Sequence, residues 1–108
     1  MTDVAIIANG GANIASLRFA LDRLGASSEL TSDPEALRRA PRVILPGVGA
    51  AADAMDRLRA LHLVEVIRTL TQPVLGICLG MQLLFDSSEE GETSCLGVIA
   101  ARVTKFPA

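Results

Sequence analysis

Aromatic residues are scarce in this sequence: it has three Phe among 108 residues and neither Trp nor Tyr. An apolar core must therefore be built from Val, Ile, Leu and Ala, a composition that suits a parallel sheet covered by helices. No apolar run approaches the roughly 20 residues that a transmembrane helix requires. The first residues also lack the basic and apolar regions of a signal peptide. We expect a cytoplasmic protein that does not enter a membrane.

The sequence also has little net charge and few cysteines. The net charge is -2 and no cluster of Lys or Arg stands out, so nothing in the charge pattern favours binding to nucleic acid or anionic lipid. The two cysteines, Cys78 and Cys95, are not arranged as CxxC, which argues against a disulfide framework or a zinc site. We expect reduced thiols, no metal and no cofactor.

Apolar runs alternate with helical patterns along the chain. Strands are expected at residues 4–8, 28–31, 42–46 and 73–77, and helices at residues 14–24, after Asp33, from Ala50 with a break near His62, and from Leu79 through Phe85. The polar residues 87–94 predict a surface loop, and residues 96–106 predict a strand or extended chain. This order predicts an α/β fold of the flavodoxin-like type: a doubly wound, mostly parallel sheet with helices on both faces, incomplete in this chain.

Three loops at the carboxyl ends of the expected strands are candidates for function, because ligands of such sheets bind there. They cover residues 9–13, 46–50 and 77–80. The last contains Cys78, placed where an apolar strand meets a helix and flanked by Gly76 and Gly80. A nucleophile at such a tight turn is exposed by a strained backbone, and a helix N-terminus favours the thiolate. The alternative is a buried Cys used as a small apolar residue, which has no need of flanking glycines.

The segment Pro46–Ala50 is the second candidate. Acyl transfer to a thiol creates negative charge on the carbonyl oxygen of the substrate, and backbone N–H groups must face that oxygen. A Gly-rich loop beside the thiol can supply one such N–H, and Leu79, directly after Cys78, can supply a second. An ordinary turn between strand and helix is the alternative for this loop.

The remaining candidates carry weaker signals. Residues 9–13 do not follow the GxGxxG pattern, so they could form a turn and helix cap, a phosphate cradle or part of a partner surface. A Cys nucleophile requires a base, commonly His. His62, the only histidine, falls in a helical region away from the loops, so we do not expect it to be that base. Cys95 is expected to pack against the core.

The sequence resembles a known family, the triad-type (class I) glutamine amidotransferases, and within it the glutaminase subunits of imidazole glycerol phosphate synthases. The resemblance covers essentially the whole chain. It rests on PVLGICLGMQLLF at residues 73–85, SEEG at 88–91, PGVG at 46–49, GGAN at 10–13 and the tail at 96–106. The chain departs from that pattern at Ala8 and Asn9, where family members often have an acidic residue and an aromatic or small residue.

The resemblance implies a role for each matching residue. Cys78 would attack the side-chain amide of glutamine, form a glutamyl thioester and release ammonia. The backbone N–H groups of Val48 and Leu79 would form the oxyanion hole after a rearrangement of a peptide in the loop. The residues that would hold the glutamine substrate are Gly47, Gly49 and Gln82.

The resemblance also implies a partner and a pathway. Ammonia would pass to a (β/α)8-barrel cyclase subunit, the partner in a heterodimer, which makes imidazole glycerol phosphate in histidine biosynthesis. The catalytic His and Glu of the family lie C-terminal to every residue present here. Residues 1–108 are therefore expected to be the N-terminal portion of a single amidotransferase domain, without useful glutaminase activity on their own.

Two other function classes remain open. One is another hydrolase with a Cys at the strand-to-helix turn, such as the peptidase or deglycase relatives of this superfamily. Those relatives are not expected to continue with LGMQ, as residues 79–82 do here. The other is a non-catalytic α/β module whose loops bind a partner or a phosphate ligand, for which Cys78 would be dispensable.

Overall fold

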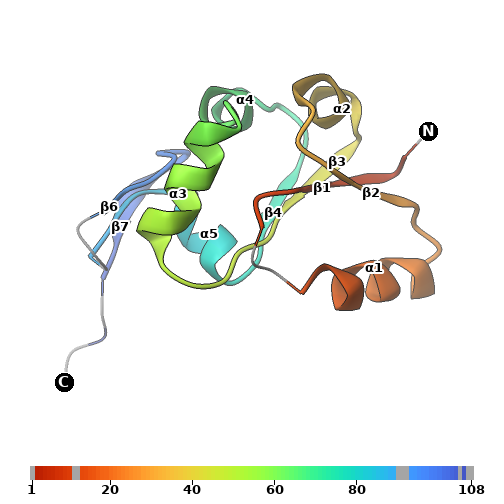
Figure 1. Ribbon diagram of the computed structural model, residues 1–108, viewed down its shortest axis with the longest axis horizontal. Coiled ribbons are helices and arrows are strands. Elements are labelled where there is room, and N and C mark those ends of the chain that lie inside the picture. The colour runs from red at the N-terminus through yellow and green to blue at the C-terminus, as the bar shows by residue number, and fades with distance from the viewer. Residues whose placement is uncertain (1, 11–12, 90–92, 105, 107–108) are drawn as a thin grey trace.

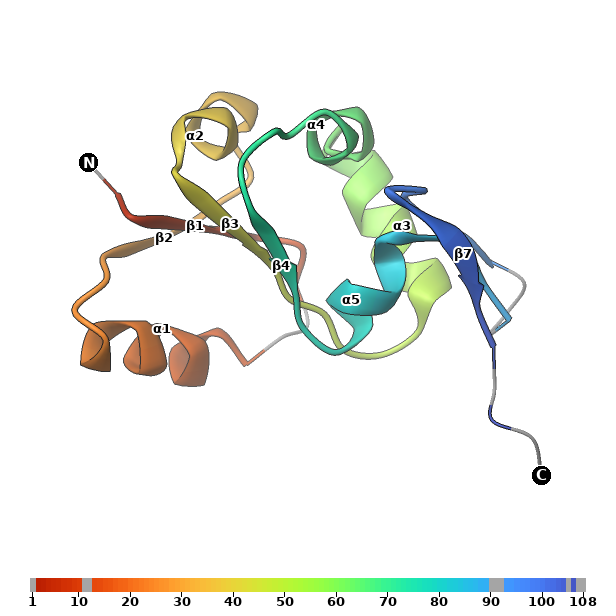
Figure 2. The ribbon, with the colours of Figure 1, turned by 180° about the vertical axis from the view of Figure 1, so that it is seen from behind.

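The computed structural model describes residues 2–10, 13–89, 93–104 and 106. Four parallel strands form the main sheet in the order β2-β1-β3-β4 (Figures 1 and 2). Their bounds are Val4–Ile7 for β1, Ser28–Thr31 for β2, Arg42–Leu45 for β3 and Val74–Gly76 for β4. The chain leaves β1 on one side to form β2 and then crosses to the other side to form β3. Sheets of this kind bind ligands at the carboxyl ends of the two strands between which the strand order reverses, which are β1 and β3 here.

The helices cover both faces of this sheet (Figure 1). Helix α1 lies on one face, and the other four helices lie on the opposite side. Their bounds are Ile14–Arg23 for α1, Pro34–Arg39 for α2, Ala51–Ala60 for α3, Val64–Arg68 for α4 and Leu79–Leu83 for α5. The predicted doubly wound α/β architecture is thus confirmed. None of the helices in the described ranges has the length and apolar composition of a membrane span.

Alternation along the strands divides the core into two clusters. Val4, Ile6 and Ile44 face α1 and pack against its partly buried apolar side chains. Their neighbours on the same strands point to the other face and join the larger cluster beneath α2 to α5. The strand members of that larger cluster are Ala5, Ile7, Val43 and Leu45. This is the side-chain period of two that a β-strand imposes.

Local sequence signals fix several helix ends. The Asn13 side chain accepts a hydrogen bond from the Ser16 N–H at the start of α1, and Gly25, with a φ of +73°, follows its end. Asp33 caps α2, in which Pro34 is the first residue. The predicted break near His62 is real: this residue has a φ of +59° and separates α3 from α4.

Two predictions for the C-terminal third are wrong. The helix after Cys78 ends at Leu83, and Phe85 begins strand β5 (Phe85–Ser88) instead of continuing the helix. The polar stretch 87–94 is not simply a surface loop, because Ser87 and Ser88 belong to β5 and pair with β6 (Thr93–Ser94). Ser88 and Thr93 are buried, so ladder pairing decides their placement where composition indicated solvent. The strand expected within residues 96–106 is present as β7 (Ile99–Val103), giving a small sheet of order β6-β5-β7.

Candidate active site

Cys78 lies in the tight turn between β4 and α5. Its backbone adopts φ 54° and ψ −122°, a left-handed conformation that non-glycine residues avoid, and its side chain is exposed. Holding a residue in such a conformation costs about 1–3 kcal/mol, which the surrounding structure must supply. The predicted elbow is therefore present, and the thiol faces solvent instead of being buried as a small apolar residue.

Three glycines allow this turn to pack against β3. A Cβ on Gly76 would lie 2.6 Å from the Cα of Met81, and one on Gly80 would overlap the carbonyl oxygen of Leu45. A Cβ on Gly47 would lie 2.9 Å from the Gly80 backbone nitrogen. Because the obstructing atoms are backbone, no side-chain rotation could make room. The glycines flanking Cys78 are thus a steric requirement of the elbow, as the sequence indicated.

The loop between β3 and α3 lies directly against the elbow. The Leu79 N–H donates a hydrogen bond to the Gly47 carbonyl over 3.2 Å, so one expected oxyanion donor is engaged in this conformation. Val48 is 47% exposed, and Gly49 has a φ of +89° that favours glycine. An oxyanion hole built from Val48 and Leu79 therefore requires the Gly47–Leu79 hydrogen bond to break and the loop to turn.

The last expected substrate-binding residue, Gln82, lies in α5. Its backbone N–H donates to the Cys78 carbonyl over 3.4 Å, and the residue is half-buried. The structure thus brings Gly47, Leu79 and Gln82 around Cys78. Val48 and Gly49 lie on the exposed part of the same loop.

His62 is not placed to act as the base for Cys78. It follows the carboxyl end of α3, whose amino end begins next to the loop of residues 46–50, called the Gly loop below. Ten helical residues separate those two ends, a rise of about 15 Å. This placement supports the prediction that His62 is not the base. Within the described part of the chain, no three His, Cys, Asp or Glu side chains gather into a group that could hold a metal ion.

Cys95 contrasts with Cys78. It is partly buried against the larger core cluster, and its Sγ lies 3.7 Å from the Thr93 carbonyl oxygen. Burial raises the pKa of the Cys95 thiol, with a smaller opposing effect from the positive charge of Arg59. A thiol that is harder to ionise is less nucleophilic at neutral pH. The prediction that Cys95 is a packing residue is confirmed.

Asn9 belongs to the site in a way that the sequence did not reveal. The residue is 2% exposed, and its Nδ2 donates to the carbonyl oxygen of Pro46, at the start of the Gly loop, over 2.9 Å. The cap expected from residues 9–13 is Asn13, while Gly11 and Ala12 fall outside the described residues. The sequence feature that could have predicted this contact is the position of Asn9, which follows a strand that pairs with the strand preceding Pro46.

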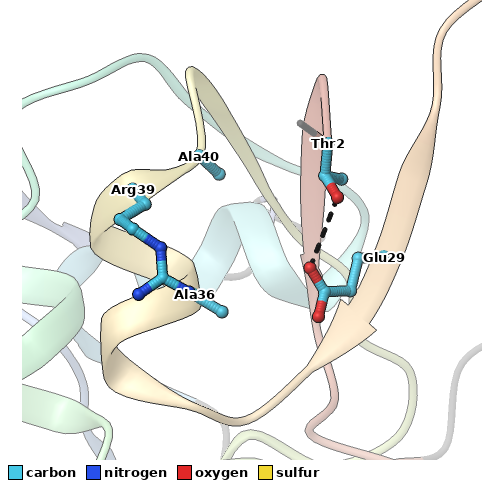
Figure 3. Close-up of a pocket in the computed structure, with 5 residues that line it drawn as sticks. All are labelled: Thr2, Glu29, Ala36, Arg39 and Ala40. Atoms are coloured by element: carbon cyan, nitrogen blue, oxygen red, sulfur yellow. Dashed lines mark hydrogen bonds between the residues drawn. The ribbon is translucent and has the colours of Figure 1, made fainter.

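A separate cavity of about 300 Å³ lies at the other end of the sheet (Figure 3). Thr2 and Glu29 line it together with three residues at α2, and the Thr2 hydroxyl donates to Glu29 over 3.4 Å. Thr2 precedes β1, whereas Cys78 follows β4, and the two strands belong to one parallel sheet. The cavity therefore lies opposite to the edge that carries the thiol. The described residues that line it include neither a cysteine nor a histidine.

Comparison with known proteins finds a matching family and similar sequences. Residues 5–104 match the model of a family described as glutamine amidotransferase class-I. The imidazole glycerol phosphate synthase subunit HisH of Xanthomonas axonopodis pv. citri is 61% identical over 99 residues, which cover 92% of this chain and 50% of that protein. The subunit of the same name from Xylella fastidiosa is 53% identical over 106 residues, or 98% of this chain and 53% of that protein.

A solved structure described as the crystal structure of glutamine amidotransferase has a similar fold. The TM-score is 0.79, with 23% sequence identity, covering 94% of this chain and 56% of the other. The chain spans about half the length of the curated relatives that it matches.

Proposed function

Because this chain belongs to the class I glutamine amidotransferase family, we propose that it carries the nucleophile for glutamine hydrolysis, with Cys78 as the attacking residue. The observation that carries the proposal is the exposed thiol at a strained strand-to-helix turn beside the loop of residues 46–49. A strained backbone conformation at a non-glycine residue persists only where the surrounding structure enforces it, and such residues cluster at active sites.

The reaction proceeds in two steps. The Cys78 thiolate attacks the amide carbon of the glutamine side chain, and the tetrahedral intermediate collapses to a glutamyl thioester. The amide nitrogen takes up a proton and leaves as ammonia. Water then cleaves the thioester, which gives glutamate and restores the thiol.

The negative charge on the tetrahedral oxygen needs two backbone donors. We assign them to the N–H groups of Val48 and Leu79, and we assign glutamine binding to Gly47, Gly49 and Gln82. The Leu79 N–H is bonded to the Gly47 carbonyl in the present conformation. A turn of the loop would free this donor and bring the Val48 N–H toward the same oxygen. Removing one such donor typically costs about a hundred- to a thousandfold in turnover.

The proton transfers need an acid–base group. His62, the only histidine of the sequence, follows the end of α3 that is farther from the loop of residues 46–50. We propose that residues 1–108 contribute the nucleophile half of one amidotransferase domain and that the acid–base pair comes from outside them.

The two HisH relatives, 61% and 53% identical, support a more specific assignment. We propose that the ammonia passes to a (β/α)8-barrel cyclase subunit bound as a heterodimer partner, which forms imidazole glycerol phosphate in histidine biosynthesis. A reducing compartment keeps an exposed thiol such as Cys78 from forming disulfides, so we place the reaction in the cytoplasm.

The assignment is tested by incubating the intact protein, meaning residues 1–108 together with the proposed acid–base half of the domain, with a diazoketone analogue of glutamine. We expect one covalent adduct, located at Cys78 by peptide mass spectrometry, together with loss of glutamate production. The Cys78→Ser variant should release less than about a thousandth of the parent's glutamate. The matched Cys95→Ser variant should keep the adduct and the activity, because Cys95 only packs against the core. An adduct absent from Cys78, or activity retained by Cys78→Ser, would overturn the amidotransferase function.

A further inference from the structure

The carboxamide of Asn9 is the most deeply buried polar side chain near the elbow. Asn9 comes directly after Ala8 at the carboxyl end of β1, and its Nδ2 donates to the Pro46 carbonyl across 37 positions of sequence. Its Oδ1 is buried and has no hydrogen-bond partner within the described part of the chain. Such an acceptor lowers stability, so its presence calls for an explanation.

The same residue is also connected to the far end of the Gly loop. The backbone carbonyl of Asn9 accepts a hydrogen bond from Nε of Arg57, which lies on α3. Helix α3 begins at Ala51, where the loop ends. Asn9 therefore bonds directly to Pro46, where the loop begins, and through Arg57 to the helix that follows the loop.

The rest of the loop has few comparable restraints. Val48, Gly49 and Ala50 are exposed, and Ala50 caps α3 without any side-chain hydrogen bond. The bond from Leu79 to the Gly47 carbonyl must break for the proposed oxyanion hole to form. When it breaks, the bond from Asn9 to Pro46 still fixes the point from which the loop turns.

Apolar packing alone does not account for an asparagine here. The residues before it, Val4 to Ile7, are apolar and buried, and an apolar side chain at position 9 would continue that packing without a buried orphan acceptor. The amide contributes one feature that an apolar residue lacks, which is the donor to the Pro46 carbonyl.

We propose that Asn9 is a positioning residue for glutamine hydrolysis: its carboxamide anchors Pro46, so that the loop of residues 47–49 presents its backbone N–H to the oxyanion formed at Cys78. The inference rests on the proposed function. Asn9 touches neither the thiol nor the substrate in this role, and it acts through the loop. Its loss should reduce turnover more than glutamine binding, because the oxyanion exists only after attack.

The test compares Asn9→Leu with the parent in the intact protein. Leu has nearly the same shape, removes the orphan Oδ1 and leaves the Pro46 carbonyl without its donor, so the two effects on stability offset each other. We expect the unfolding temperature to change by no more than about 3 °C. We expect kcat to fall about ten- to a hundredfold, with KM for glutamine within about threefold of the parent. The smaller Asn9→Ser variant, which is too short to reach Pro46, should show the same kcat loss if Asn9→Leu does not fold.

Gln72 offers a matched control. Its Nε2 donates to the backbone carbonyls of Leu37 and Ala40, at 2.7 and 3.0 Å, far from the Gly loop. Gln72→Met removes bonds of the same kind and should leave kcat unchanged. The rate of Cys78 alkylation by iodoacetamide should be equal in all variants, because this reaction needs no oxyanion hole. Labelling by the glutamine diazoketone should be slower in the Asn9 variants only.

Each outcome of this comparison is decisive. If the parent takes no diazoketone label at Cys78, the amidotransferase function fails and the role of Asn9 fails with it. If the parent is labelled but the Asn9 variants match it in kcat and labelling rate, the function stands and Asn9 is only structural. A kcat loss of equal size in Gln72→Met would show a general effect of lost amide bonds and would overturn the positioning role.

Discussion

Glycines control the geometry around Cys78 at the scale of single residues. Gly47, Gly76 and Gly80 each stand where a side chain would strike backbone atoms of a neighbouring element. Their role there is steric and does not depend on a positive φ. Gly25, by contrast, has open space around its Cα and a φ of +73°, so its role is conformational. The two kinds of glycine should respond differently to the same substitution.

Gly80→Ala should destabilise the protein by more than about 3 kcal/mol, because the new methyl group would overlap the Leu45 carbonyl oxygen, which also accepts the Ile77 N–H. Gly25→Ala should cost only about 1 kcal/mol, the price of a left-handed Ala without a clash. Urea unfolding of the two variants gives both values. Equal losses of unfolding free energy in the two variants would show that the close approach of α5 to β3 does not exclude a side chain at position 80.

At the scale of whole elements, the two ten-residue helices differ in how they dock. Helix α3 buries Ala51, Ala54, Met55 and Leu58 in the larger core cluster. Helix α1 has no fully buried residue; its side chains Ile14, Leu17 and Leu21 are half-buried over a cluster of three strand residues. The helix that follows the Gly loop is therefore the better anchored of the two. Anchoring of this kind suits a helix that holds one end of the proposed oxyanion loop.

Two leucine substitutions should measure this difference. Leu58→Ala in α3 should cost about 3 kcal/mol, because the residue is fully buried. Leu21→Ala in α1 should cost only about 1 kcal/mol, because solvent already reaches the side chain. Amide hydrogen exchange should also be faster in α1 than in α3. Equal losses for the two leucines would contradict the docking described here.

At the scale of the whole molecule, burial dominates over surface charge. One cluster connects the sheet with four of the helices, and its members are almost all aliphatic. By contrast, ion pairs within single helices have side chains that are about half exposed or more, as in Arg38–Glu35, Arg59–Asp56 and Arg68–Glu65. Exposed pairs of this type each contribute only a few tenths of a kcal/mol.

A combined variant tests that ranking. Replacing Arg38, Arg59 and Arg68 with Gln together should lower the free energy of unfolding by no more than about 1 kcal/mol. A single change of the buried Met55 to Ala should cost about 2–5 kcal/mol. Thermal or urea unfolding compares the two directly. A larger loss from the three arginine changes than from Met55→Ala would mean that surface charge stabilises the fold more than its core does.

The sequence by itself determined the features that depend on neighbouring residues. The alternation of apolar runs and helical patterns predicts the parallel sheet. Asn13 and Gly25 mark the ends of α1, and glycines around Cys78 identify the strained elbow. These signals are legible because backbone sterics and caps act over a few positions along the chain.

Only the tertiary structure decided the features that depend on distant residues. Asn9 meets the Pro46 carbonyl across 37 positions of sequence, and the Leu79 N–H is engaged by the Gly47 carbonyl from another strand-to-helix loop. Ser88 becomes buried through a ladder pair that its polar neighbours did not indicate. The two loop contacts exist because parallel strand pairing brings separate loops to one edge of the main sheet, whereas Ser88 is placed by the antiparallel pairing of β5 with β6. No local pattern records which backbone groups meet in either case.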